Sequence, residues 1–386
     1  MKKFNISLAV VATLAVCSTV NAQSLSEALK DGKVSGEVTA TFENRNFDKD
    51  SGTYSQDTSY SMGSFALKYE TAVWNNISFT SKIRAYKILF EEDDELKTWK
   101  GKGDASERFY EDGKNRTIDA EELFLSYTPN ANITVTVGRQ NISTDWINKT
   151  HDALKVDAVY GDTSVEAIWS TRQGRVTSRD YRPMTKMNDN DGVYKLGVTH
   201  QFDDTIAATG YALVMPDIKD IYGARANLTF GDTLIRTHYA VSDDKSDSKN
   251  DSSLIDLMAS SKIAGFTPYI GYIKVDSDAS FPGYNQGSGE ILVPFEEGDY
   301  VYSKDAETLY AGLTKSFGEL STTLLYGTTK YDVGADSLRI HETTLWMGYS
   351  IMKELNVNLG YTIVDEDSKS TVSDYDQVNV TIAYSF

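Results

Sequence analysis

Cysteine, proline and long apolar runs are all scarce in this chain of 386 residues. With a single cysteine, an intrachain disulfide is excluded. The longest apolar run, at residues 6–16, is too short for a transmembrane helix, which needs roughly 20 apolar residues. Basic residues are outnumbered by acidic ones, 38 against 56, and the formal net charge is -18. Nucleic-acid affinity comes mainly from neutralising phosphates with Lys and Arg, so the composition argues against a nucleic-acid partner.

The N-terminal segment has the features of a secretory signal peptide. Lys2 and Lys3 precede the apolar run, and Ala22 ends a short stretch suited to cleavage. We therefore predict a signal peptide at residues 1–22 and a single domain at residues 23–386. Cys17 would be the first mature residue of a lipoprotein, but Val16 is a poor fit before a lipidated cysteine. We interpret Cys17 as a small residue of the apolar run.

Motifs for catalysis and metal binding are also missing. The four histidines lie on separate segments, without the HExxH spacing of a metal site: His151, His200, His238 and His341. No GxSxG motif is present, although a Ser/His pair assembled from separate strands stays open. We predict no enzyme activity, no catalytic residue and no cofactor. Carboxylate runs at residues 91–95 and 295–299 are candidates for Ca²⁺ binding, with hydrated loops as the alternative.

What the sequence does contain is an alternation of apolar and polar residues. Val34, Val38 and Phe42 alternate with polar residues, and the same period of two recurs at residues 123–127, 154–160, 194–198, 222–230, 345–349 and 357–363. A β-strand with one apolar and one polar face produces this pattern. The chain is therefore predicted to be all-β.

Short and long connections alternate along the chain. Short turns are expected at residues 74–76, 128–132, 161–164, 203–205, 231–233, 264–266, 317–320 and 352–355. Long polar stretches are expected at about residues 44–59, 91–116, 139–152, 171–191, 242–252, 276–305 and 329–340. This asymmetry is typical of a transmembrane antiparallel β-barrel with short periplasmic turns and long extracellular loops. Counting strands around the turns predicts 18, or 16 if weak segments near residues 206–214 and 308–328 are not strands. A barrel this wide leaves an aqueous passage.

Aromatic residues close most of the strands that enter a short turn. Such rings favour the membrane interface, so they predict a girdle at one level of the bilayer, although aromatics are also common in strands generally. The girdle candidates, which include the C-terminal assembly signal, are Tyr127, Tyr160, Phe202, Phe230, Phe317, Tyr349, Tyr384 and Phe386. The final strand is expected to pair with the first and abolish the free edge. Outer-membrane lipid, lipopolysaccharide and, during insertion, the barrel-assembly machinery are the expected partners.

The polar positions of the strands are expected to line the passage. Several cations on strands close in sequence predict a basic stripe that selects solutes by charge, with unselective solvated wall residues as the alternative. The pore-lining candidates are Lys82, Arg84, Lys155, Asp157, Lys195, Arg225, Arg236, His238 and Lys262. His200 and Lys315 fall on the lipid face near short turns, where such side chains can extend to the interface.

The stretch at residues 138–152 is the candidate for a loop that folds inward and narrows the passage. Its constriction candidates are Arg139, Gln140, Asp145 and Trp146. The next polar stretch concentrates Arg172, Arg175, Arg179 and Arg182. These arginines are suited to attracting carboxylates or phosphates, and equally to pairing with acidic loops or lipopolysaccharide.

Several segments resemble one family. The stretches ALKDGKVSGEVTATFENRNF and YTPNANITVTVGRQNISTDWIN, with the aromatic C-terminus, resemble OprD-like porins, especially epsilonproteobacterial ones such as the campylobacter major outer membrane porins. The resemblance implies an 18-stranded barrel, often a homotrimer, that carries small polar solutes past inward loops and a ladder of basic wall residues. Lys155, Arg225 and Arg236 correspond to that ladder. Residues 138–140 match the segment before the third loop, although Arg139 continues a lipid-facing series.

The sequence thus predicts an outer-membrane porin that allows passive, charge-selective diffusion of small hydrophilic solutes and ions. The alternative is a structural or adhesive outer-membrane barrel whose loops bind a surface. The expected location is the outer membrane of a Gram-negative bacterium. The sequence leaves the solute, the sign of the ion selectivity and the constriction loop open.

Overall fold

The computed structural model describes residues 24–48, 56–92, 96–98, 101–103, 105–110, 117–245, 251–281, 294–298, 300–334, 336–367 and 374–386. The predicted signal peptide and Cys17 lie outside the described residues, as do residues 93–95 and 299 of the two acidic runs. Among the residues described, no helix has the length and apolar character needed to cross a membrane.

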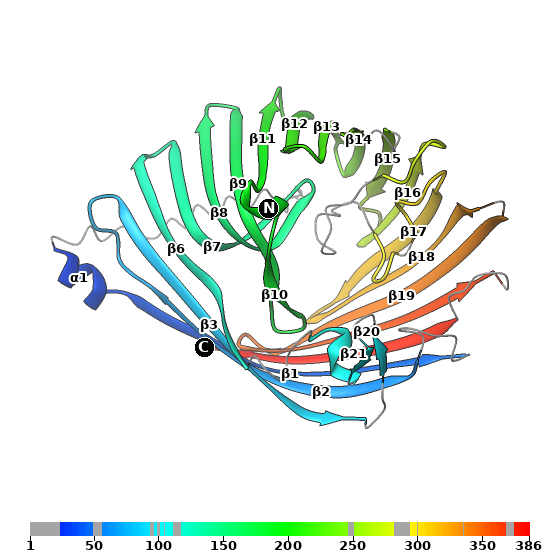
Figure 1. The fold of residues 1–386 in the computed structure, drawn as a ribbon, viewed down its shortest axis with the longest axis horizontal. Helices are drawn as coiled ribbons and strands as arrows, with labels where there is room; N and C mark the ends of the chain where they lie inside the picture. Colours follow the sequence, from blue (N-terminus) through cyan, green and yellow to red (C-terminus); the bar gives the residue numbers. More distant parts are fainter. Residues whose placement is uncertain are drawn as a thin grey trace.

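Eighteen strands close into one antiparallel ring, as the turn count predicts, and Figure 1 shows them as a curved wall around a central space. They are β1 (Lys33–Phe47), β2 (Thr58–Glu70), β3 (Ile77–Glu91), β6 (Ile118–Asn130), β7 (Ile133–Thr144), β8 (Ile147–Tyr160), β9 (Thr163–Val176), β11 (Val193–Gln201), β12 (Ile206–Met215), β13 (Lys219–Phe230), β14 (Thr233–Asp244), β15 (Ser252–Ser261), β16 (Phe266–Val275), β17 (Glu307–Phe317), β18 (Leu320–Val333), β19 (Asp336–Met352), β20 (Leu355–Glu366) and β21 (Tyr375–Ser385). The two weak segments are strands, so the 16-stranded alternative is wrong.

Six further elements, none expected from the sequence, lie before the ring or in its connections. They are α1 (Leu25–Lys30), β4 (Leu96–Thr98), β5 (Gly101–Gly103), the 3₁₀ helix η1 (Ala105–Arg108), β10 (Tyr181–Lys186) and the 3₁₀ helix η2 (Asn188–Asn190). β4 and β5 pair only with each other, whereas β10 pairs with the end of β9.

The C-terminal residue completes the ring. β21 pairs with β1 from Tyr375 opposite Phe47 to Ser385 opposite Glu37. Phe386 continues this ladder, because its N–H donates to the Gly36 carbonyl at 3.0 Å and its carbonyl accepts from Gly36 N–H at 2.9 Å. The Phe386 ring covers Gly36, where an added Cβ would lie 2.2 Å from the ring Cζ. The first and last strands therefore leave no unpaired edge at the seam.

Alternation along the strands gives the wall an apolar outer face and a polar inner face. On β11, Leu196 is 52% exposed and its neighbour Lys195 only 4% exposed. The predicted girdle residues are all exposed outside the ring near the short turns: Tyr127, Tyr160, Phe202, Phe230, Phe317, Tyr349, Tyr384 and Phe386. His200 and Lys315, the two polar residues expected on the lipid face, contact aromatic rings near the short turns. Lys315 Nζ lies 4.2 Å from the ring centroid of Phe266, and His200 packs edge-on against Phe202.

The two ends of the ring differ in their connections. All eight predicted short turns are present, between β2 and β3 and between the seven following pairs at the same end. At the other end, the predicted loops at 139–152 and 329–340 are wrong. β7 and β8 pair up to Thr144 opposite Ile147, and β18 and β19 up to Val333 opposite Asp336. At these strand ends the apolar residues are buried on the inner side, as Ile142, Ile147, Leu338 and Ile340 are, so the apolar outer face expected of a wall strand is missing although backbone pairing continues.

Part of the wall folds into the lumen. β6 and β7 separate beyond Leu123 opposite Arg139, and β9 leaves β11 beyond Ser170 opposite Val193. Residues 140–144, 147–151, 171–176 and 181–186 instead pair with one another, and we call them the inner sheet. Its apolar residues Ile142 and Ile147, and Trp146 in the turn between β7 and β8, are buried in one cluster with the inner faces of β12 to β15. Figure 1 shows β10 in the middle of the space that the wall surrounds.

Candidate functional site

Eight of the nine pore-lining candidates lie on the inner face of the ring. They are Lys82, Arg84, Lys155, Asp157, Lys195, Arg225, Arg236 and His238. Lys262 continues the inward parity of β15 but follows its last residue and is exposed beside a short turn. Its backbone N–H donates to the Asp232 carbonyl, which continues the pairing of β14 and β15 to the rim.

The tip of the β7–β8 hairpin meets the wall at a hydrogen-bonded chain. Trp146 is fully buried at this tip, and its indole N–H donates to the Tyr211 hydroxyl at 2.6 Å. The same hydroxyl lies 2.6 Å from His238 Nε2. The indole ring also packs against Phe281 and Tyr302, with centroids 5.0 and 5.8 Å away. The predicted inward fold of this segment is therefore present, built from strands instead of a loop.

Two buried ion pairs flank that chain. Asp145, at the hairpin tip, accepts a hydrogen bond from Arg225 Nη1 at 2.6 Å. Arg236 Nη2 pairs with Asp256 at 2.9 Å. Arg225 and His238 are cross-strand neighbours on β13 and β14, and Arg236 lies two residues before His238 on the same face. The four side chains Arg225, Arg236, His238 and Asp145 therefore form one cluster beside the inner sheet, which we call the arginine cluster.

Three nitrogens of the arginine cluster have no hydrogen-bond partner. Arg225 Nε, Arg236 Nε and His238 Nδ1 are all buried and unpaired. The Tyr211 hydroxyl accepts the hydrogen bond from Trp146 and donates its own proton to His238 Nε2. Because Nε2 accepts, the neutral imidazole carries its proton on Nδ1. Three N–H donors from two adjacent strands thus lack an acceptor. An unpaired buried donor is costly, which makes the cluster a candidate binding site.

The remaining predicted cations are paired with carboxylates in the same wall. Glu166 lies between Lys195 and Lys155, at 3.1 and 3.4 Å, and Lys155 also contacts Asp157 at 2.5 Å. Three strands away around the ring, on β3, Lys82 and Arg84 both pair with Glu121, at 2.7 and 2.9 Å. The predicted basic stripe is therefore interleaved with carboxylates, so these cations do not give the wall an uncompensated positive charge.

Arg139 and Gln140 lie where the inner sheet leaves the wall. Arg139 Nη1 bonds to Asp119 at 2.9 Å and to the Ala120 carbonyl at 3.2 Å, and its Nε bonds to Asp152 at 2.8 Å. It thereby bridges β6 and β8 where β6 and β7 separate. Gln140 is buried and donates to the Ala153 carbonyl at 3.1 Å. The side chains of Arg139 and Gln140 thus bond to the wall strands β6 and β8.

A second inward contact is made by the loop between β9 and β10. Arg179 lies 2.6 Å from Glu296 and 3.3 Å from Glu43 of β1. Burial alone would lower the pKa of Arg179, but these two carboxylates raise it above its ordinary range, so the guanidinium stays charged. Arg175 pairs with Asp180 in the same loop at 2.5 Å. Two of the four predicted arginines therefore pair with acidic groups, one of the two alternatives that the sequence left open.

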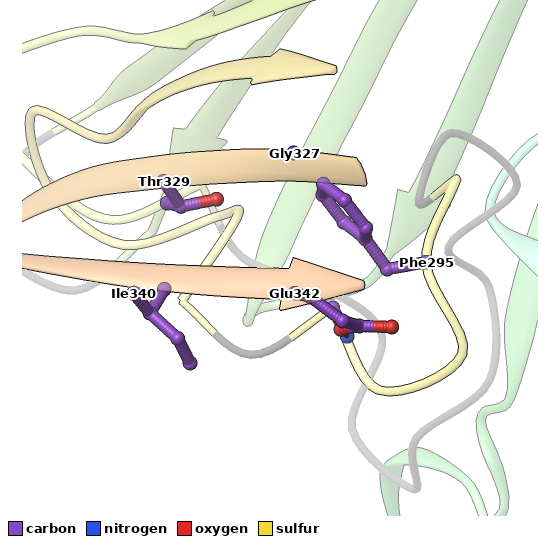
Figure 2. Close-up of a pocket in the computed structure, with 6 residues that line it drawn as sticks. Phe295, Gly327, Thr329, Ile340 and Glu342 are labelled. Carbon is purple, nitrogen blue, oxygen red and sulfur yellow. Dashed lines mark hydrogen bonds between the residues drawn. The ribbon is translucent and has the colours of Figure 1, made fainter. Parts of the chain in front are cut away.

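The described part of the second acidic run is held against the wall, as Figure 2 shows. Glu342 on β19 accepts three backbone N–H bonds from residues 296, 297 and 298, at 2.8, 3.3 and 3.0 Å. The cavity beside it measures about 10 Å³, at the lower limit for one water molecule. Within the described residues, no group of three or more His, Cys, Asp or Glu side chains is arranged to hold a metal. Calcium binding at the two acidic runs stays a prediction.

A larger hollow lies on the outside of the ring. It measures about 300 Å³ and is lined mainly by outward apolar residues of β8, β9, β11 and β12, among them Leu154, Trp169, Tyr194 and Leu196. Its lining is almost entirely apolar, which suits lipid better than a polar solute. The solute path is therefore to be sought inside the ring.

The sequence reasoning missed the tyrosines of the lumen. Tyr60, Tyr86, Tyr110 and Tyr181 pack in one buried cluster that joins β2, β3 and β10 to the segment after η1. Tyr60 and Tyr86 occupy the polar parity of their strands, and an aromatic at such a position was the available signal. Tyr211 carries the same signal on β12.

Comparisons with known proteins agree with this architecture. A family described as Gram-negative porin matches residues 7–385. Among solved structures, Pseudomonas aeruginosa OccK3 (OpdO) is 16% identical with a TM-score of 0.74, covering 94% of this chain and 98% of that one. Acinetobacter baumannii OccAB2 is 15% identical with a TM-score of 0.74, covering 93% and 99%. Pseudomonas aeruginosa OpdK with vanillate is 16% identical with a TM-score of 0.71, covering 93% and 99%. The comparison with curated proteins finds no significant match.

Proposed function

Because this chain belongs to the Gram-negative porin family, we propose that its passage favours small carboxylates, which bind at the arginine cluster. The chain is a porin of the bacterial outer membrane, through which small hydrophilic solutes diffuse passively. Its fold is that of the OprD-like and Occ channels.

The single observation behind the proposal is the set of three unpaired donors in the arginine cluster. A carboxylate has two oxygens and accepts several hydrogen bonds, and bonds to charged guanidinium groups are among the stronger ones. Arg225 and Arg236 each keep an Nε–H that their aspartate partners do not use. Because Asp145 and Asp256 already offset the two positive charges, a bound carboxylate would be held mainly by directed hydrogen bonds. Weak binding of this kind suits a channel, where a solute has to leave as well as enter.

A structural relative supports the same class of solute. OpdK was solved with vanillate, an aromatic carboxylate, and it shares the fold of this chain at 16% identity. In this chain the arginine cluster lies next to Trp146, Tyr211 and Phe281, so an aromatic carboxylate would meet both donors and rings. We therefore extend the proposal to small aromatic carboxylates.

The reversal potential of the purified protein in a planar bilayer under a salt gradient tests the proposal. Arg225→Gln with Arg236→Gln removes two donors and two charges from the cluster, and we expect the permeability ratio to shift toward cations. The matched control, Lys262→Gln with Lys353→Gln, removes the same charge from exposed positions beside short turns. An equal shift in both double variants would mean that the cluster does not set selectivity.

Current block by benzoate separates binding from charge selection. We expect benzoate to reduce the open-channel current in a concentration-dependent way, and neutral benzyl alcohol to have little effect. The Arg225→Gln and Arg236→Gln variant should lose most of the block. Equal block by the acid and the alcohol would contradict a carboxylate site and leave a porin without this preference.

The other finer expectations stay predictions of the sequence. They are the homotrimer, the contacts with lipopolysaccharide and the barrel-assembly machinery, and the likeness to campylobacter porins within the wider family.

A further inference from the structure

The short helix α1 precedes the barrel and has two distinct faces. Ser24 caps it, because its hydroxyl accepts from Glu27 N–H and the Glu27 carboxylate accepts from Ser24 N–H. At about 100° per residue, Leu25, Ala28 and Leu29 share one side of the helix, and the polar residues occupy the other. Ala28 is buried, whereas Leu25 is 52% and Leu29 49% exposed. About half of the surface of Leu25 and of Leu29 is thus uncovered by the described residues.

The barrel holds α1 on the outer side of its rim. Tyr69 shares the parity of Phe65 and Leu67 on β2, whose side chains are exposed on the lipid-facing surface. The Tyr69 hydroxyl donates to the Leu29 carbonyl at the end of the helix, and its ring lies over Gly32. Ala72 N–H also donates to the Ala28 carbonyl at 3.1 Å. Figure 1 shows α1 outside the wall, at the end of β1.

We propose that α1 lies in the membrane interface, with Leu25 and Leu29 inserted among the acyl chains of the leaflet next to the short turns. The exposed leucines continue an apolar surface that already faces lipid, formed nearby by Val34, Leu67 and Phe386. A helix with one apolar and one polar side lies in the interface plane, with its apolar side at the boundary of headgroups and acyl chains. The occupant of this face is therefore the bilayer.

Anchoring at this place would act on the seam of the ring. α1 leads directly into β1, and β1 pairs with the last strand. A helix fixed in the interface would hold the start of β1 at the level of the girdle residues Tyr384 and Phe386.

Spin labels on single cysteines test the proposal, because the chain has only Cys17, which is replaced by Ser. The test site is Leu29→Cys, the matched control is Lys30→Cys on the polar, exposed side of α1, and the reference is Leu125→Cys on the lipid face of β6. Each labelled protein is reconstituted in phosphatidylethanolamine and phosphatidylglycerol vesicles. Collisions of the label with oxygen and with a water-soluble nickel complex are then measured.

We expect the oxygen-to-nickel accessibility ratio at position 29 to be several-fold higher than at position 30 and to approach that at position 125. A ratio at 29 equal to that at 30 would place α1 in water and overturn the proposal. A label at 29 that neither reagent reaches would show a protein cover, and dipolar coupling between labels would show a second copy; both contradict the lipid assignment. Leu25→Cys repeats the test if Leu29→Cys does not give a folded, heat-modifiable barrel.

Discussion

Gly138 lies at the point where β7 leaves the wall for the inner sheet. Its φ is +126°, a conformation that residues with a side chain rarely adopt, and an added Cβ would lie 2.3 Å from the Leu123 carbonyl oxygen. We expect Gly138→Ala to lower the free energy of unfolding by about 1–3 kcal/mol, because the backbone must strain or shift. Urea unfolding in lipid, followed by heat-modifiable migration, measures this.

Gly210→Ala is the control for that substitution. Gly210 lies in β12, has no positive φ, and has open space where a Cβ would be. We expect little change in its unfolding free energy. A similar loss in both variants would indicate a general cost of replacing strand glycines, and not strain at the departure of the inner sheet.

At the residue scale, the period of two predicts which side of the wall a residue faces but not its partner. Arg225 and Arg236 face inward as expected, yet their pairing with Asp145 and Asp256 depends on which strands become neighbours and on the inward hairpin tip. Arg139 has lipid-facing parity, and only the separation of β6 and β7 explains its bonds to Asp119 and Ala120. Lys262 has inward parity but lies just beyond the last residue of β15, at the exposed rim.

At the scale of elements, Arg179 holds the loop between β9 and β10 against the opposite wall. Arg179→Gln removes the ion pairs with Glu43 and Glu296, and we expect the freed loop to give a larger and noisier single-channel conductance. Lys186→Gln removes a positive charge from an exposed position of β10 and is the control. Unchanged noise in Arg179→Gln, or equal noise in both, would show that this contact does not restrict the passage.

The eight short turns were predictable because turn residues interrupt a clear alternation there. The inner sheet was not, because Ile142 and Ile147 keep a strand pattern whether the strand lies in the wall or in the lumen. Its inward course depends on packing against β12 to β15, which are distant in sequence. Helix α1 was missed because six residues are too few for a helical period to be recognised.

At the scale of the whole molecule, the ring depends on its C-terminal residue. Phe386→Ser removes the ring that covers Gly36 and stacks near Phe65, at 6.4 Å between centroids. We expect a several-fold lower yield of heat-modifiable barrel in the outer membrane, because an interfacial aromatic at the seam is lost. Phe386→Tyr retains the ring and should assemble normally. Equal yields of the two variants would show that the aromatic ring is not needed at this position.

The pairing of β1 with β21 also imposes an order in time. Glu37 and Ser385 are partners although nearly the whole chain separates them. The entropy of closing such a long loop is modest, since each doubling of length adds only about 0.6 kcal/mol. The delay is what matters, because β21 is synthesised long after β1. Until β21 has been made, β1 keeps an open strand edge, so synthesis of β21 is itself a condition for a closed, aggregation-resistant product.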